Sequence, residues 1–191
     1  AQSSLRSTGR WHPDEDALTV QSGTLTHRAI WTGVAFGIAL AIDFVTKWLI
    51  LNLVMMPPRT IEIAPFFNLT LGFNTGVSFG MFRELFLERP LLLAGISAVM
   101  VTGLLVWAIR AEKRLETISA GLIAGGAAGN VVDRLLQGAV TDFLDFHVGD
   151  WHWPAFNMAD VVIVVGVVLL ISGSLWPTRA VQEGLGRART R

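Results

Sequence analysis

The sequence contains no cysteine and few charged residues. Without cysteine, the chain cannot form disulfides, use a thiol nucleophile, bind a metal or an iron–sulfur cluster through thiolates, or be palmitoylated. Charged residues make up only 16% of the chain, whereas a soluble domain carries about 25%. The 15 basic and 15 acidic residues cancel, and no basic stripe is present, which argues against a nucleic-acid partner. With 52% hydrophobic residues over 191 positions, the composition is typical of a membrane protein.

Four apolar stretches are long enough to cross about 30 Å of hydrocarbon as helices, at about 1.5 Å per residue. The expected spans are residues 29–54, 90–110, 116–137 and 157–177. They define a transmembrane domain over residues 28–178, between a polar N-terminal tail (1–27) and a basic C-terminal tail (179–191).

A cleavable signal peptide is the alternative for the first stretch. Arg28 precedes the apolar run, and residues 39–41 read Ala-Leu-Ala, which resembles a cleavage site. The run continues to Met56, which favours a retained span.

Basic residues predict the orientation of the chain, because Lys and Arg accumulate in cytoplasmic connections. Ten of them lie before the first expected span, from the end of the second span to the start of the third, and after the fourth. We therefore expect both termini in the cytoplasm and the loops after the first and third spans on the opposite side.

The first outer loop carries a period-two pattern over residues 59–80. Ile61, Ile63, Phe67 and Leu69 alternate with other residues before a glycine-rich turn, which predicts a small strand or hairpin. Residues 82–87 are predicted to form a short amphipathic surface helix. The fold class is therefore an all-α membrane protein with four transmembrane helices, a small extracytoplasmic β segment and a short amphipathic helix. Residues 138–154 are interpreted as a loop.

Charged residues inside the first span need a partner or a function, because burying a charge in lipid is costly. Asp43 and Lys47 lie at i and i+4, on one face of the helix. They are either an ion pair that supports packing or the border of a polar cavity. In the third span, Gly121, Gly125 and Gly129 form a small-residue face suited to close contact with another helix.

Further polar residues cluster near the outer edge of the third and fourth spans. Asn130, Asp133 and Arg134 share a helix face, either as an interfacial anchor or as part of a site. Asn157 and Asp160 resemble a capping box at the start of the fourth span. Two carboxylates in a partly dry site share a proton, so one can activate water while the other donates to a carbonyl. The residues alone do not show which aspartates meet.

Five blocks of sequence, in order, resemble a known family. They are residues 43–47 (DFVTK), 73–80 (FNTGVSFG), 129–134 (GNVVDR), 140–143 (VTDF) and 156–160 (FNMAD). These blocks resemble the conserved blocks of lipoprotein signal peptidase, also called signal peptidase II. The resemblance runs from about Arg28 to Trp176 and covers all four expected spans.

The resemblance implies an aspartic endopeptidase of the bacterial inner membrane with its site near the extracytoplasmic face. Its expected substrates are diacylglyceryl-modified prolipoproteins, cut before the lipidated cysteine, and it is expected to be a target of globomycin. The family pattern places the catalytic pair on Asp142 and Asp160. It assigns substrate binding and support to Asp43, Lys47, Asn74, Gly76, Asn130, Asp133, Arg134, Asn157 and Ala159.

Within this family reading, Asn130 and Arg134 are the candidates for holding the substrate backbone. The substrate's signal helix is expected to pack near the glycine face of the third span, with its acyl chains among the spans and in contact with membrane lipid. No metal, organic cofactor or obligate protein partner is expected.

Three other functions remain open at the level of sequence. Ser78, where the family usually has alanine, completes a G-x-S-x-G motif and could act as a nucleophile with His147 or His152. Asp145, His147, Asp150 and His152 could instead bind a metal in a transporter. A non-enzymatic four-helix scaffold would explain the glycine face but not the clustered charges.

Overall fold

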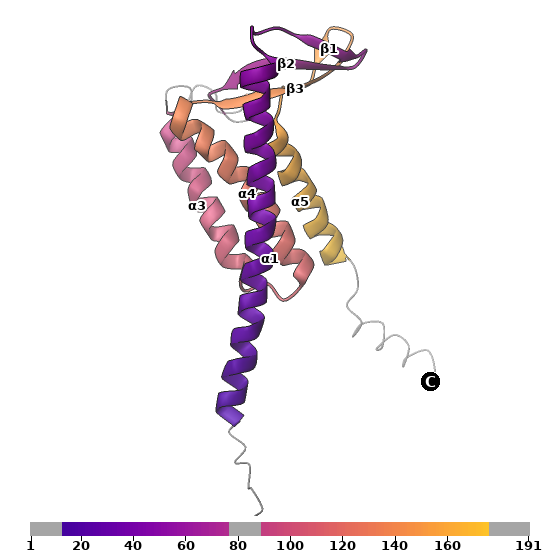
Figure 1. Cartoon of the computed structure of the whole chain (residues 1–191). Coiled ribbons are helices and arrows are strands. Elements are labelled where there is room, and N and C mark those ends of the chain that lie inside the picture. Colours follow the sequence, from indigo (N-terminus) through magenta and orange to yellow (C-terminus); the bar gives the residue numbers. More distant parts are fainter. Residues whose placement is uncertain (1–12, 77–88, 176–191) are drawn as a thin grey trace, which may run out of the picture.

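The structure, a computed structural model, describes residues 13–76 and 89–175, with side chains from residue 25 onward. In chain order, its elements are α1 (Pro13–Leu49), the π-helical turn η1 (Ile50–Val54), β1 (Ile61–Ala64), β2 (Phe67–Asn74), α3 (Pro90–Ala108), α4 (Arg114–Gln137), β3 (Val140–Val148), β4 (Trp151–His152) and α5 (Met158–Leu175). Figure 1 shows the helices as a bundle with the strands gathered at one end.

Four helices are long and apolar enough to cross a membrane. These segments are Leu25–Val54, Pro90–Ala108, Arg114–Gln137 and Met158–Leu175. Together with the small antiparallel sheet, they confirm the predicted fold class. The amphipathic helix expected at residues 82–87 and the basic tail expected at 179–191 lie outside the described residues.

The first helix is longer than expected. It begins at Pro13, so residues 13–27, expected to belong to the polar N-terminal tail, are helical. Proline suits the first helical position, because its ring fixes φ and its missing N–H needs no partner there. Figure 1 shows α1 extending beyond the other helices at the end opposite the sheet.

The central helix α4 packs against α1, α3 and α5. A Cβ atom added at Gly121 would lie 2.6 Å from the carbonyl oxygen of Thr32, and one added at Gly129 would meet the Asp43 carboxylate. The glycine face of α4 is therefore filled by α1. Because α1 occupies this face, the substrate's signal helix, expected near it, would lie beside α1 and not directly on these glycines.

The sheet joins two outer segments that are distant in sequence. Its antiparallel order is β1-β2-β3-β4, with Asn74 paired to Val140 and Gly72 to Asp142. Residues 138–154 are thus largely strand, and their interpretation as a loop was wrong. β3 forms because β2, far upstream in the chain, provides its backbone hydrogen-bond partners.

A small core beneath the sheet fixes its position on the bundle. Ile50 and Met55, at the end of the first membrane helix, pack with Phe143 of β3. Burial of these apolar side chains holds β3 against the helical bundle. The residue next to Phe143 on this strand is Asp142.

Candidate active site

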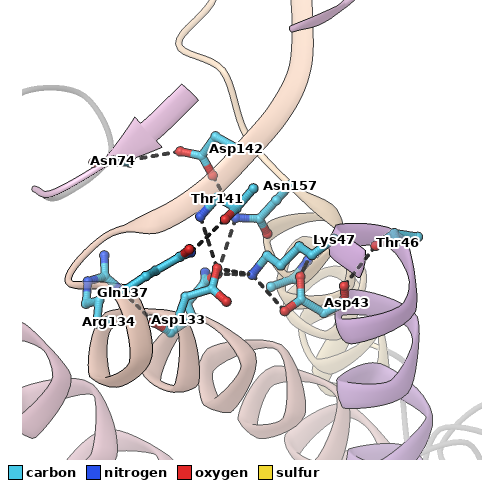
Figure 2. A network of polar contacts seen from close by, with 12 residues as sticks. Asp43, Thr46, Lys47, Asn74, Asp133, Arg134, Gln137, Thr141, Asp142 and Asn157 are labelled. Carbon is cyan, nitrogen blue, oxygen red and sulfur yellow. Dashed lines mark hydrogen bonds and ion pairs between the residues drawn. The ribbon is translucent and has the colours of Figure 1, made fainter. Parts of the chain in front are cut away.

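Asp142 and Asp160 come together at the outer end of the bundle. Asp142 lies on β3 and is 4% exposed, while Asp160 lies in the first turn of α5. Asn157 bridges them: its Nδ2 donates to Asp142 Oδ1 at 2.7 Å, and its main-chain N–H donates to Asp160 Oδ2 at 3.2 Å. The two aspartates that the family pattern singled out are therefore held by one intervening residue. Figure 2 shows Asp142 beside Asn157.

The start of α5 is held by side chains from two helices. Asn157 Oδ1 accepts the Asp160 N–H at 3.2 Å. Together with the bond from the Asn157 N–H to Asp160 Oδ2, this contact forms the predicted capping box. Asp43 Oδ1, from α1, accepts the N–H of Ala159 at 3.1 Å. Carboxylates are favoured at this end of a helix because the macrodipole is positive there. The position of Asp160 is thus fixed relative to α1.

Two more amides donate to the paired carboxylates. Asn74 Nδ2, at the end of β2, donates to Asp142 Oδ2 at 3.1 Å. Asn130 Nδ2, from α4, donates to Asp160 Oδ1 at 3.1 Å. Each carboxylate oxygen of the pair therefore accepts at least one hydrogen bond, which orients both groups.

Lys47 is the centre of a buried charge network. Its Nζ lies 2.7 Å from Asp43 Oδ2, 2.9 Å from Asp133 Oδ2 and 3.1 Å from Asn130 Oδ1. The Asp43–Lys47 pair also lines a cavity of about 190 Å³ between α1 and α4. Asp43 and Lys47 therefore form the predicted ion pair and also border a cavity, so both interpretations from the sequence apply. Figure 2 shows the ammonium group between the two carboxylates.

Asp133 anchors β3 to α4. Its Oδ2 accepts the main-chain N–H of Thr141 at 3.0 Å, and Gln137 Nε2 donates to Thr141 Oγ1 at 2.7 Å. Because Thr141 directly precedes Asp142, these bonds help to place the carboxylate. The sequence analysis missed Gln137 and Thr141. The only available signal was that Gln137 follows Asp133 by one helical turn.

Arg134 holds the end of β2. Its Nη2 donates to the carbonyl oxygen of Gly76 at 3.1 Å, and its Nη1 donates to the carbonyl of Asn130 at 3.3 Å. Gly76 in turn donates its N–H to Asn74 Oδ1 at 3.0 Å. Within the described residues, the buried Nε of Arg134 has no hydrogen-bond partner. Of the two residues expected to hold a substrate backbone, Arg134 therefore retains a donor, whereas Asn130 uses its amide on neighbouring side chains.

Burial raises the pKa of Asp142 to about 6 from 3.8, and the negative charge of Asp160 adds to the rise. Hydrogen bonds from Asn157 and Asn74, and the charge of Lys47, act in the opposite direction. A carboxyl group with this pKa can hold or release a proton close to neutral pH, which suits acid–base chemistry.

An apolar groove of about 490 Å³ leads to Asp160 along the outer turns of α5. Its lining residues are Trp153, Pro154, Ala155, Phe156, Asp160, Val161, Ile163, Val164 and Val165. A second apolar hollow of about 440 Å³, under the β3–β4 hairpin, shares Trp153 and Phe156 with it. The two hollows are therefore adjacent. Among the described residues that line the first, only Asp160 is ionisable.

The histidines of the β3–β4 hairpin contact a carboxylate and each other. His152 Nδ1 lies 2.8 Å from Asp145 Oδ1, and its ring stacks on that of His147 with 4.9 Å between centroids. Across residues 13–76 and 89–175, no three His, Asp or Glu side chains are grouped so that they could hold a metal. Within the described residues, the alternative of a metal site in this hairpin therefore has no supporting group of ligands. Ser78 lies outside the described residues.

Comparisons with known proteins identify relatives over most of the chain. Residues 35–176 match the family model described as signal peptidase (SPase) II. A lipoprotein signal peptidase of Rhodopseudomonas palustris (strain TIE-1) is 43% identical over 150 residues, covering 76% of this chain and 92% of the relative. The lipoprotein signal peptidase of Hydrogenovibrio crunogenus is 39% identical over 155 residues, covering 80% of this chain and 89% of the relative.

A solved structure shares the fold. It is described as a bacterial membrane enzyme determined by the in meso method at 1.9 Å resolution, and it superposes with a TM-score of 0.64 at 27% identity. The match covers 77% of this chain and 94% of that structure.

Proposed function

Because the chain belongs to the signal peptidase II family, whose members are proteases of lipoprotein signal peptides, we propose that Asp142 and Asp160 are its catalytic pair. The chain is a multi-pass membrane protease that cleaves the signal peptides of lipoproteins. The proposal concerns its chemistry, which is that of an aspartic endopeptidase.

The hydrogen bonds of Asn157 carry this proposal. Through its side chain and its main chain, this residue contacts both carboxylates, which come from different elements. Such an arrangement allows two aspartates to share one proton and to act together on a water molecule. Burial of Asp142 supports the same conclusion, because a raised pKa allows one member to stay protonated.

The apolar groove along α5 is the proposed binding site for the lipid part of the substrate. The diacylglyceryl chains would reach it sideways from the bilayer, because Val164 and Val165 lie on the exposed face of a membrane helix. The scissile bond, next to the lipidated cysteine, would then lie at the Asp160 end of the groove. Arg134, whose buried Nε has no hydrogen-bond partner within the described residues, would donate to a substrate carbonyl.

We further propose an inner-membrane location with both termini in the cytoplasm and residues 28–178 as the peptidase domain. The sheet and the paired aspartates would then face the extracytoplasmic side. At the other end of the bundle, the Arg114 guanidinium lies 3.6 Å from the centre of the Trp31 ring. Such a cationic and aromatic pair suits the cytoplasmic interface. Membrane lipid surrounds the helices in this arrangement, and the reaction requires no protein partner.

The test is cleavage of a diacylglyceryl-modified prolipoprotein by the purified protein in lipid. Asp142→Asn and Asp160→Asn are each expected to abolish turnover while retaining the wild-type thermal unfolding profile at pH 5. Asp150→Asn is the matched control, because it removes an exposed carboxylate from the same β3–β4 hairpin and should leave activity unchanged. Full activity of either paired-aspartate variant would overturn the proposal.

Two further samples separate the alternatives. Ser78→Ala is expected to cleave like wild type, and a chelator is expected to have no effect. Loss of activity in either sample would favour a serine nucleophile or a metal-dependent reaction.

A further inference from the structure

The β3–β4 hairpin exposes an apolar face. Successive side chains of a strand point to opposite faces, so Phe146 and Val148 project from the same side of β3. Trp151 pairs with Val148 across the hairpin and extends that side onto β4. The exposed fractions are 41% for Phe146, 76% for Val148 and 60% for Trp151. Large apolar side chains therefore collect on one side of the hairpin and remain accessible there.

The opposite face of the hairpin is polar. It carries His147 and His152, which pair across the two strands and stack with 4.9 Å between their ring centroids. His152 Nδ1 lies 2.8 Å from Asp145 Oδ1, and Asn68 of β2 donates to Asp145 Oδ2 at 3.3 Å. Amphipathic helices with such a division of faces lie at the boundary between lipid and water, and the same physical reasoning applies to a hairpin.

The apolar face continues the side of the sheet that rests on the helical bundle. Leu144, two residues before Phe146, packs against the small core beneath the sheet. Beyond Leu144, the exposed Phe146 and Val148 present the same side of the strand. The hollow under the hairpin also shares Trp153 and Phe156 with the groove along α5. The hairpin thus extends an apolar surface that begins on a membrane helix.

The hairpin lies at the depth of a membrane interface. α5 begins at Met158, five residues after Trp153, and has 18 residues. At about 1.5 Å per residue it is about 27 Å long, close to the thickness of the hydrocarbon layer, about 30 Å. The headgroup layer, about 6 Å thick, therefore begins near the first turn of α5. Tryptophan is enriched in this layer, because its ring is apolar and its N–H is polar.

We propose that the apolar face of the hairpin docks on the lipid at the sheet end of the bundle, with its side chains between the headgroups and the first acyl carbons. This docking face consists of Phe146, Val148, Trp151 and Trp153. The Asp145–His152 pair remains on the side of the water. The docked hairpin holds β3, and with it Asp142, at a fixed depth. The inference rests on the membrane-spanning helices and does not depend on which residues form the catalytic pair.

Spin labelling tests the position of the hairpin. Because the chain contains no cysteine, one introduced cysteine takes one nitroxide label. Val148→Cys places the label on the docking face, and Glu62→Cys is the matched control. Glu62 is exposed and belongs to the polar side of the sheet, because it pairs with Asn68, which pairs with Asp145. In phospholipid vesicles, electron paramagnetic resonance measures label collisions with oxygen, which partitions into lipid, and with a water-soluble nickel chelate.

The ratio of oxygen to nickel collisions should be about threefold or more higher at position 148 than at position 62. Equal ratios, in labelled proteins that unfold at the wild-type temperature, would overturn the proposal. Spin–spin broadening at position 148 that disappears on dilution with unlabelled protein would show that a second copy of the chain covers the face instead of lipid. Loss of nickel collisions only after addition of a prolipoprotein would assign the face to a substrate segment.

Tryptophan fluorescence provides a second measurement that introduces no label. The difference between wild type and Trp151→Phe isolates the emission of Trp151, while phenylalanine keeps an apolar ring in its place. Brominated phospholipids should quench this difference about twofold or more, and bromine near the headgroup should quench more than bromine at the chain end. Absence of quenching by both lipids would place Trp151 in water and overturn the proposal. Neither measurement uses turnover, so failure here is distinct from failure of the proposed catalytic pair.

Discussion

Asn157 and Asp142 are joined by a 2.7 Å hydrogen bond from Nδ2 to Oδ1, although Asn157 is also the N-cap of α5. The same side chain therefore defines where a membrane helix begins and how a buried carboxylate on the sheet is oriented. This residue therefore combines a structural role with its proposed role at the catalytic pair, and the two roles involve different atoms. Its Oδ1 caps the helix, and its Nδ2 contacts the carboxylate.

Substitution by serine separates these two roles. Asn157→Ser keeps a good helix cap but is too short to donate to Asp142. We expect a loss of kcat of about tenfold or more and a loss of stability of about 1–2 kcal/mol, because the buried Asp142 oxygen loses its donor. Asn157→Ala should lose the same activity and about 1 kcal/mol more of stability, because it also lacks the cap. Thermal unfolding and prolipoprotein cleavage measure the two effects, and wild-type kcat in Asn157→Ser would contradict the role of Nδ2.

The raised pKa of Asp142 predicts a pH dependence of stability. Between 3.8, the ordinary value, and about 6 in the folded protein, the native state binds more protons than the unfolded state. Stability therefore falls as pH rises through this window, by up to about 3 kcal/mol for this group. Asp142→Asn removes the titration, so its melting temperature should decline less than that of wild type between pH 4 and 7. Parallel declines in the two proteins would contradict the shift.

The membrane helices were predictable because each is a long apolar run, and the capping box was predictable because Asn157 and Asp160 are close in sequence. β3 was not, because Asp142, Asp145 and His147 give its sequence the polarity of a loop. Its strand conformation depends on β2, whose register with β3 no local pattern encodes.

The contacts within the site likewise divide into those encoded by nearby residues and those that depend on distant segments. The spacing of Asp43 and Lys47 predicts their ion pair, because both lie on one helix. The contacts of Lys47 with Asp133 and Asn130 depend on how closely α1 packs on α4. The glycine face predicted close packing of α4 but did not identify its partner. The contacts of Gly121, Gly125 and Gly129 identify this partner as α1.

If the groove along α5 binds the acyl chains, a larger side chain in it should weaken substrate binding. Val164→Trp places a large ring in the groove and should raise KM for a diacylglyceryl substrate about tenfold or more, because the displaced acyl chain loses apolar contacts. Val99→Trp on α3 is the control, since Val99 is 73% exposed and does not line the groove. Steady-state kinetics in lipid provide the measurement. Equal KM values for the two variants would exclude this groove as the lipid site.

Substitution of Gly129 should affect both the packing of α1 on α4 and the geometry of the site. A Cβ atom at this position would enter the space of the Asp43 carboxylate, which binds Lys47 and the Ala159 N–H. Gly129→Ala should therefore push α1 from α4, weaken the ion pair and destabilise the protein by about 3 kcal/mol. Because Asp43 also holds the start of α5, kcat should fall even at temperatures where the variant remains folded.

Gly37→Ala provides the matched control for this helix interface. A Cβ atom at Gly37, on α1, would meet nothing within 4 Å. Since alanine favours helix more than glycine does, this variant should be as stable as wild type or more stable by up to about 1 kcal/mol, with unchanged kcat. Thermal unfolding and cleavage assays on both variants compare the same chemical change at a packed and an open site. If Gly129→Ala behaved like Gly37→Ala, the close contact between α1 and α4 would not determine the geometry of the site.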